Sequence, residues 1–217
     1  GRERRVCDLT AGKETIMNRK LGIISSLATL VCVLAFAACM LIDSDMGSYI
    51  SSMGISWGFV PMICAFAALA DKEKRATAHT AVAFAAVYAV LIALVYYAQI
   101  TTVRLSALSD EAYGLLSYTE FGLFFNYDLL GYAFMALSTF FISFALTPDG
   151  RGDGWLKWLL RIHGVFAVSC VLLPALGLFK PGMAGGDLLG VLVLEFWCAY
   201  FTPVCILAYR YFKRAGA

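Results

Sequence analysis

The chain has 217 residues, of which 61% are hydrophobic and only 15% are charged. Soluble domains average ~45–50% apolar and ~25% charged residues, so the composition excludes an ordinary soluble domain. The formal net charge is only +2, and the basic residues form no nucleic-acid-binding motif, so no nucleic-acid partner is expected.

The first 20 residues are polar and contain six basic residues. They lack the apolar run of a secretory signal peptide, so we expect residues 1–20 to form an N-terminal cytoplasmic tail. An alternative is that Met17 is the native start. A Lys-Glu pair followed by two residues and Met17 is what a translated purine-rich ribosome-binding site looks like.

Six apolar runs follow, each about 20 residues long, which is enough to cross ~30 Å of hydrocarbon as a helix. The runs do not alternate and are too long for barrel strands. The sequence therefore predicts an all-α, polytopic integral membrane protein. Its bundle of six transmembrane helices would fill residues 21–212, with a tail over 213–217. The predicted spans are 21–42, 50–70, 77–100, 121–146, 158–179 and 188–209.

The connections between the spans differ sharply in charge. Of the 17 basic residues, 15 lie in the two tails, the second-to-third connection, or the fourth-to-fifth connection with the start of the fifth span. The remaining connections contain only Arg104 and Lys180. Because basic residues accumulate on the cytoplasmic side, both termini are predicted to be cytoplasmic, in a bacterial inner membrane.

The second span begins with "SSMGISWG". Small residues let helices approach each other closely in membranes, so we expect a tightly packed helix pair here. The third span ends in "YYAQITTVR", which puts Tyr97 and Gln99 near the outer surface. Arg104 follows Tyr97 by one heptad and shares its face, so its long side chain is expected to reach toward deeper acidic groups.

Two carboxylates lie inside predicted spans, Asp128 in the fourth and Glu195 in the sixth. Each follows an acidic residue at the outer edge of its span by eight positions, Glu120 and Asp187 respectively. Eight helical residues correspond to ~12 Å of depth. Charges at such depth are costly and are functional candidates by default. Since Arg104 can neutralise only one of the two acids, the surplus carboxylate predicts a proton- or cation-binding site.

Other polar and aromatic residues fall at comparable depth and complete the predicted ligand site: Asn126, Tyr132 and Trp197, beside Tyr97 and Gln99. Aromatic faces beside carboxylates suit an organic cation. An aromatic belt at the membrane interface is the alternative for the aromatic residues. For Asp128 and Glu195 the alternative is a structural ion pair or a hydrogen-bonded clamp between helices.

No cofactor and no metal site are expected. His79 and His163 fall near the cytoplasmic ends of the third and fifth spans, and paired histidines can ligate haem b. His79, however, only begins its helix, so interfacial hydrogen bonding is the favoured interpretation. Six of the seven cysteines lie in apolar runs, where cysteine behaves as a small hydrophobic residue.

At "YYAQITTVR" and "NYDLLGYAFMALSTFF" the chain resembles a family of bacterial multi-pass membrane proteins defined only as a domain of unknown function. The resemblance covers most of residues 17–212. It implies a six-helix inner-membrane protein and supplies no activity.

The function predicted from these residues is an integral membrane protein whose outward-facing polar site binds or moves a small ligand, cationic or proton-coupled. A chain this short suggests a homodimer or a membrane partner subunit. The first alternative is an accessory or sensor subunit in which the polar residues clamp helices. The second is an intramembrane enzyme, which would need both acids around one cavity.

Overall fold

The computed structural model describes residues 2–179 and 186–214, with side chains for residues 15–179, 188 and 190–214. Within those residues the backbone forms helices and short connections, with no strand. Six of these helical segments are long and apolar enough to cross a membrane. The predicted all-α architecture with six candidate spans is therefore confirmed.

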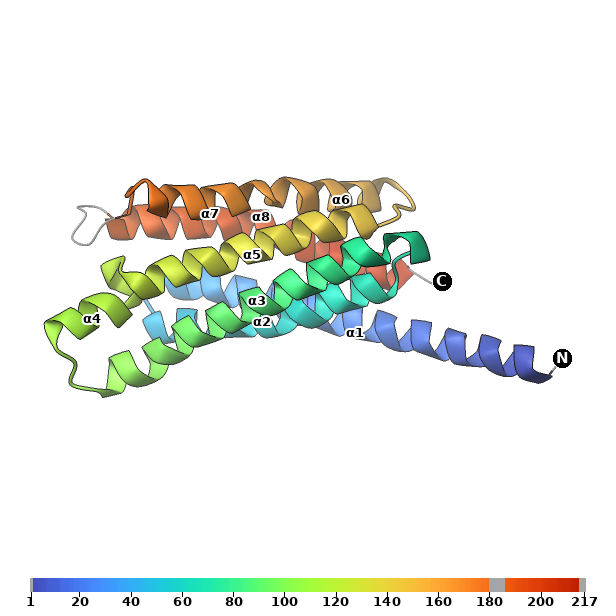
Figure 1. The fold of residues 1–217 in the computed structure, drawn as a ribbon, viewed down its shortest axis with the longest axis horizontal. Helices are drawn as coiled ribbons and strands as arrows, with labels where there is room; N and C mark the ends of the chain where they lie inside the picture. The colour runs from blue at the N-terminus through green and yellow to red at the C-terminus, as the bar shows by residue number, and fades with distance from the viewer. Residues whose placement is uncertain (1, 180–185, 215–217) are drawn as a thin grey trace.

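The helices run side by side along the long axis of the molecule, and α4 lies at the opposite end from the two chain termini (Figure 1). Their bounds are α1 (Arg2–Leu41), α2 (Asp45–Ala68), α3 (Arg75–Ala98), α4 (Asp110–Leu116), α5 (Leu123–Ala145), α6 (Arg151–His163), α7 (Val165–Ala175) and α8 (Gly186–Arg214). Helix α1 packs against α2 and α8, α3 against α2 and α5, and α5 against α6 and α7.

Glycines of α2 face α1 at very short range. A Cβ atom at Gly58 would lie 2.5 Å from Oγ1 of Thr29 and 3.0 Å from its backbone nitrogen. One at Gly54 would lie 2.6 Å from Sγ of Cys32. Only residues without a side chain allow this distance between the helices, as "SSMGISWG" predicts. The predicted close approach of the second span is confirmed.

The fifth span differs from its predicted bounds. It begins at Arg151 instead of 158 and is divided at Gly164 into α6 and α7. Hydropathy missed residues 151–157 because this first part of α6 is two-faced: Asp153 and Leu156 are buried against the bundle, while the opposite face exposes Trp155. This earlier start puts His163 in the middle of the span, not near its cytoplasmic end as predicted.

A folded segment joins the third and fourth spans. Helix α3 continues into a π-helical turn, Gln99–Val103, and α4 begins where the hydroxyl of Ser109 accepts a hydrogen bond from the backbone N–H of Ala112. Gly122 then allows the chain to pass over α4, because a Cβ atom there would lie 2.1 Å from the carbonyl oxygen of Gly114. Residues 104–122 thus cover the end of the bundle, and we call them the end segment.

Candidate functional site

A cavity of about 70 Å³ lies between α5, α6, α7 and α8, beneath the end segment. We call it the inner cavity. Residues from four helices line it, together with Tyr118 of the end segment and Phe179. The main polar and aromatic lining residues are Tyr118, Phe125, Asp128, Tyr132, His163, Cys170 and Trp197.

Asp128 is the acidic residue of the inner cavity, and its side chain is only 1% exposed. Among the described residues it forms no ion pair, and its Oδ1 atom has no hydrogen-bond partner. The phenol groups of Tyr96 and Tyr118 are the hydrogen-bonding neighbours of the carboxyl group. Protein groups therefore solvate one side of this carboxyl but supply no cation to balance its charge.

Tyr118 is held over Asp128 by the buried amide of Gln99. The backbone N–H of Tyr118 donates to Oε1 of Gln99 at 2.9 Å, and Nε2 of Gln99 donates to the carbonyl of Leu116 at 2.9 Å. Loss of solvation raises the pKa of the Tyr118 phenol well above its ordinary value, so the phenol remains a hydrogen-bond donor. Gln99 thereby positions a donor above the carboxyl group.

His163 and Trp197 also line the inner cavity and are joined by a hydrogen bond. Nε1 of Trp197 donates to Nε2 of His163 at 3.1 Å, and Nδ1 of His163 lies 2.8 Å from Oγ1 of Thr139. Because an indole nitrogen only donates, Nε2 is the unprotonated nitrogen, and Nδ1 donates to Thr139. The hydroxyl of Thr139 donates in turn to the carbonyl of Ala136 at 2.9 Å. His163 is therefore a neutral imidazole with both nitrogens engaged.

Several aromatic rings line the inner cavity together with Asp128. Tyr132 meets Trp197 edge to face with ring centroids 5.2 Å apart, and Tyr118 lies 5.4 Å from Phe125. Such rings present electron-rich faces that attract cations. The inner cavity thus combines one carboxyl group with an aromatic wall.

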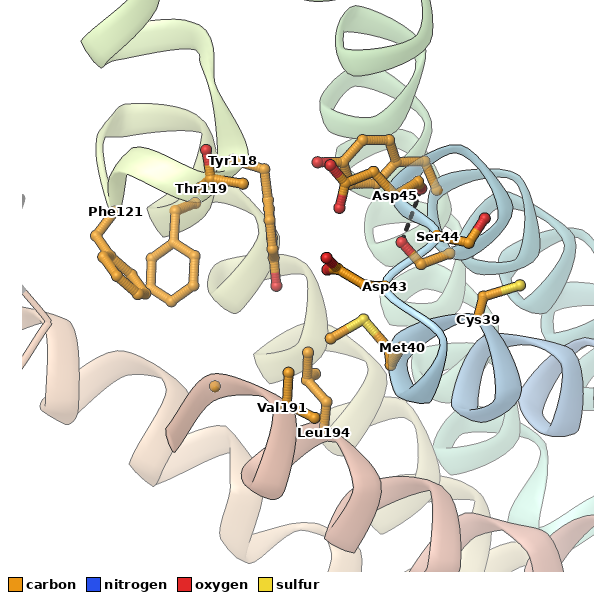
Figure 2. Close-up of a pocket in the computed structure, with 14 residues that line it drawn as sticks. Cys39, Met40, Asp43, Ser44, Asp45, Tyr118, Thr119, Phe121, Val191 and Leu194 are labelled. Carbon is orange, nitrogen blue, oxygen red and sulfur yellow. Dashed lines mark hydrogen bonds between the residues drawn. The ribbon is translucent and has the colours of Figure 1, made fainter. Parts of the chain in front are cut away.

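A second, outer cavity of about 160 Å³ lies at the corner between α1 and α2. Figure 2 shows Asp43 directing its carboxylate into this space, toward Tyr118, with Met40 and Leu194 beneath. Asp43 adopts a left-handed conformation with φ of 55°, which asparagine and aspartate tolerate better than most residues. The outer and inner cavities share four lining residues, Tyr118, Phe125, Gly190 and Leu194, so they adjoin each other.

The structure brings together three of the eight predicted ligand residues. Asp128, Tyr132 and Trp197 line the inner cavity. Gln99 lies nearby, but its amide is occupied by the end segment. Asn126 is exposed and lines neither cavity.

The other three predicted residues lie away from Asp128. Tyr97 is 60% exposed, and Arg104 is exposed, with its Nε atom donating to the carbonyl of Ile100 in the same helix. Tyr97 is exposed and its neighbour Tyr96 is buried, so the side of α3 that carries Tyr97 points away from the bundle. The π-helical turn between Tyr97 and Arg104 breaks the heptad spacing used to place them on one face. Glu195 is half-buried with an unpartnered Oε1 atom, but it lines neither cavity. The structure does not join the two carboxylates in one chamber.

Sequence reasoning missed Tyr118, Phe125, His163 and Asp43 as cavity residues. Tyr118 and Asp43 lie in connections between spans, and hydropathy does not predict whether a connection folds back onto the bundle. Phe125 precedes Asp128 by three positions in α5, a spacing that puts both on one helix face, so this signal was present.

Haem ligation has no support from the geometry. Nε2 of His163 already accepts the Trp197 indole hydrogen bond, and His79 is exposed. In the part of the chain with described side chains, no group of three or more His, Cys, Asp or Glu residues gathers as a metal site, and the six described cysteines are free.

No protein-family model, no curated protein and no solved structure matches this chain.

Proposed function

We propose that this protein is a membrane-embedded binding or transport protein whose inner cavity accepts a small organic cation. The carboxyl group of Asp128 would pair with an ammonium group of the ligand. Tyr118, Phe125, Tyr132 and Trp197 would surround that group with aromatic rings.

The observation that carries this proposal is a buried carboxyl group beside a cavity, with no cationic side chain paired to it. Burying an ionised carboxylate alone is very costly, so the group must hold a proton or accompany a cation. Asp128 is 1% exposed, its Oδ1 atom is unpartnered, and it lies in no ion pair of the described residues. A purely structural clamp would satisfy both carboxyl oxygens.

The lining favours an organic ammonium ion over a hard metal ion. Hard cations such as Ca²⁺ prefer about 6–8 oxygen ligands. The inner cavity offers one carboxyl group, phenols and apolar rings. Ammonium groups bind the faces of aromatic rings, and one carboxylate suffices to balance their charge.

The outer cavity supplies an entry route. Asp43 and Asp45 line it, and Tyr118 and Phe125 separate it from Asp128. Acidic groups at the mouth of a cleft raise the local concentration of cations. In the sequence, 15 of the 17 basic residues belong to the tails and connections at the opposite end of the bundle. Because basic residues accumulate on the cytoplasmic side, we propose that this entrance faces the periplasm.

Fluorescence of Trp197 provides a direct test. The other tryptophans, Trp57, Trp155 and Trp158, are exposed, so W57F/W155F/W158F leaves Trp197 as the single reporter in the cavity wall. We expect methylammonium and ethylammonium, which are small enough for a cavity of about 70 Å³, to change its emission saturably in purified protein. Their uncharged analogues methanol and ethanol should have no such effect.

Variants in the same background separate charge from shape. Asp128→Asn should weaken cation binding at least tenfold, while Glu195→Gln, which alters the acid outside both cavities, should leave it unchanged. Phe125→Leu, which keeps the carboxyl group, should weaken binding severalfold and covers the case in which Asp128→Asn does not fold. The proposal would be refuted if the uncharged analogue bound as tightly as the cation. It would also be refuted if the Asp128 and Phe125 variants both bound the cation as tightly as the parent protein.

A further inference from the structure

A third hollow, of about 370 Å³, lies where α6 begins and α8 ends, at the end of the bundle away from α4 (Figure 1). Gly152 of α6 and four residues of α8 line it: Leu207, Arg210, Lys213 and Arg214. We propose that this hollow binds the phosphate headgroup of an anionic phospholipid. The proposal is independent of any ligand at Asp128.

The three cations lie on one face of α8, because their spacing of three and four residues places side chains together. Arg214 forms an ion pair with the buried Asp153 of α6. The other ion pair among the described residues joins Lys74 to Asp71, so Arg210 and Lys213 have no acidic partner there. Like charges on one helix face repel each other, and a bound anion would relieve that repulsion.

The hollow lies beside a surface suited to lipid. On the outer face of α6, Trp155 and Trp158 are 66% and 56% exposed, and Ile162 is also exposed. Tryptophan is enriched where hydrocarbon meets headgroups. Gly152 has no side chain to fill the hollow between this face and α8. The cations therefore lie at the depth where a headgroup would be found.

The chemistry of the lining favours a phosphodiester. The guanidinium group is planar and matches phosphate oxygens with two parallel hydrogen bonds. Arg214 is already oriented by Asp153. Arg210 and Lys213 are exposed, and Nζ of Lys213 lies 5.8 Å from the centroid of the Tyr209 ring, an exposed contact that an anion can replace. Basic pockets between membrane helices are typical headgroup sites. The acyl chains of the same lipid would cover the exposed face of α6, which a soluble phosphate would leave bare.

Native mass spectrometry tests the assignment on the full chain in neutral detergent, with equal amounts of phosphatidylglycerol and phosphatidylcholine. We expect at least fivefold more phosphatidylglycerol adducts than phosphatidylcholine adducts. The variant R210Q/K213Q should bring this ratio close to one. The control K72Q/R75Q removes the same charge from exposed residues at the same end but outside the hollow, and should keep the ratio.

Several outcomes would overturn the proposal. An unchanged ratio in R210Q/K213Q would show that Arg210 and Lys213 do not bind the headgroup. An equal loss of selectivity in K72Q/R75Q would show that the lipid responds to surface charge in general and not to this hollow. If inorganic phosphate bound the delipidated protein through Arg210 and Lys213 while phosphatidylglycerol did not, the ligand would be a soluble anion. The single variant R210Q, expected to lower the ratio at least twofold, decides the matter if the double variant does not fold.

Discussion

Two polar side chains in adjacent spans show how differently buried groups are used in this protein. The amide nitrogen of Gln99 donates to the carbonyl of Leu116, and its amide oxygen accepts from the backbone N–H of Tyr118. Asp128 keeps one carboxyl oxygen without a partner, beside a cavity. Sequence reasoning assigned both residues to a ligand site, because depth alone does not reveal which hydrogen bonds a side chain makes. The satisfied amide is a positioning group, and the unsatisfied carboxyl is the candidate for binding.

At this scale we predict that Gln99→Leu destabilises the protein by about 1–3 kcal/mol for each backbone group left without a partner. The Leu116 carbonyl and the Tyr118 N–H would both lose their bond. Unfolding with sodium dodecyl sulfate in mixed micelles measures the change in free energy. Thr102→Ala, at an exposed position of the same π-helical turn, is the control. Equal stability of the two variants would contradict the role assigned to Gln99.

The helices themselves were largely predictable, and their exceptions have physical causes. Long apolar runs must form helices in a bilayer, because every backbone polar group needs a partner within its own segment. Hydropathy missed the first part of α6, residues 151–157, where charged residues alternate with apolar ones, and it did not describe the end segment, which is too polar to be a span. The close contact between α1 and α2 was predictable, since glycines recur on the contacting face of α2.

We predict that alanine has opposite effects on stability at two glycines: Gly58, in the contact between α1 and α2, and Gly154, in α6. Gly58→Ala places a Cβ atom 2.5 Å from Oγ1 of Thr29, and overpacking of this kind costs about 1–3 kcal/mol. Gly154→Ala, in α6, meets nothing within 4 Å and should gain up to about 1 kcal/mol from helix propensity.

The same micelle unfolding assay compares these two alanine variants. If Gly58→Ala were neutral or stabilising, like the α6 control, α1 and α2 would not be packed as closely as described.

At the scale of the whole molecule, the two ends of the bundle have different chemistry. The end with the chain termini contains most of the basic residues and the hollow beside α8. The other end contains the end segment and the outer cavity with Asp43 and Asp45. An even number of spans places both termini at one end, and the charge difference predicts which end faces the cytoplasm.

This orientation predicts the behaviour of reporter fusions. Green fluorescent protein fused after residue 217 should fluoresce, because it folds in the cytoplasm. Alkaline phosphatase inserted at Ser109, an exposed position of the end segment, should be active, because it needs the oxidising periplasm. The reversed pair of activities would invert the topology and place the outer cavity on the cytoplasmic side.

The sequence by itself determined the all-helical architecture, the number of candidate spans and the position of Asp128 inside one of them. Those features follow from local composition and helix length, which do not depend on how the helices face each other. Only the tertiary structure decided that Tyr96 faces inward and Tyr97 outward, that Glu195 lies outside the cavity, and that Tyr118 and His163 line the same cavity as Asp128. A site between helices depends on the rotation of each helix about its axis. That rotation is decided by packing among all the helices, and depth along a single span does not specify it.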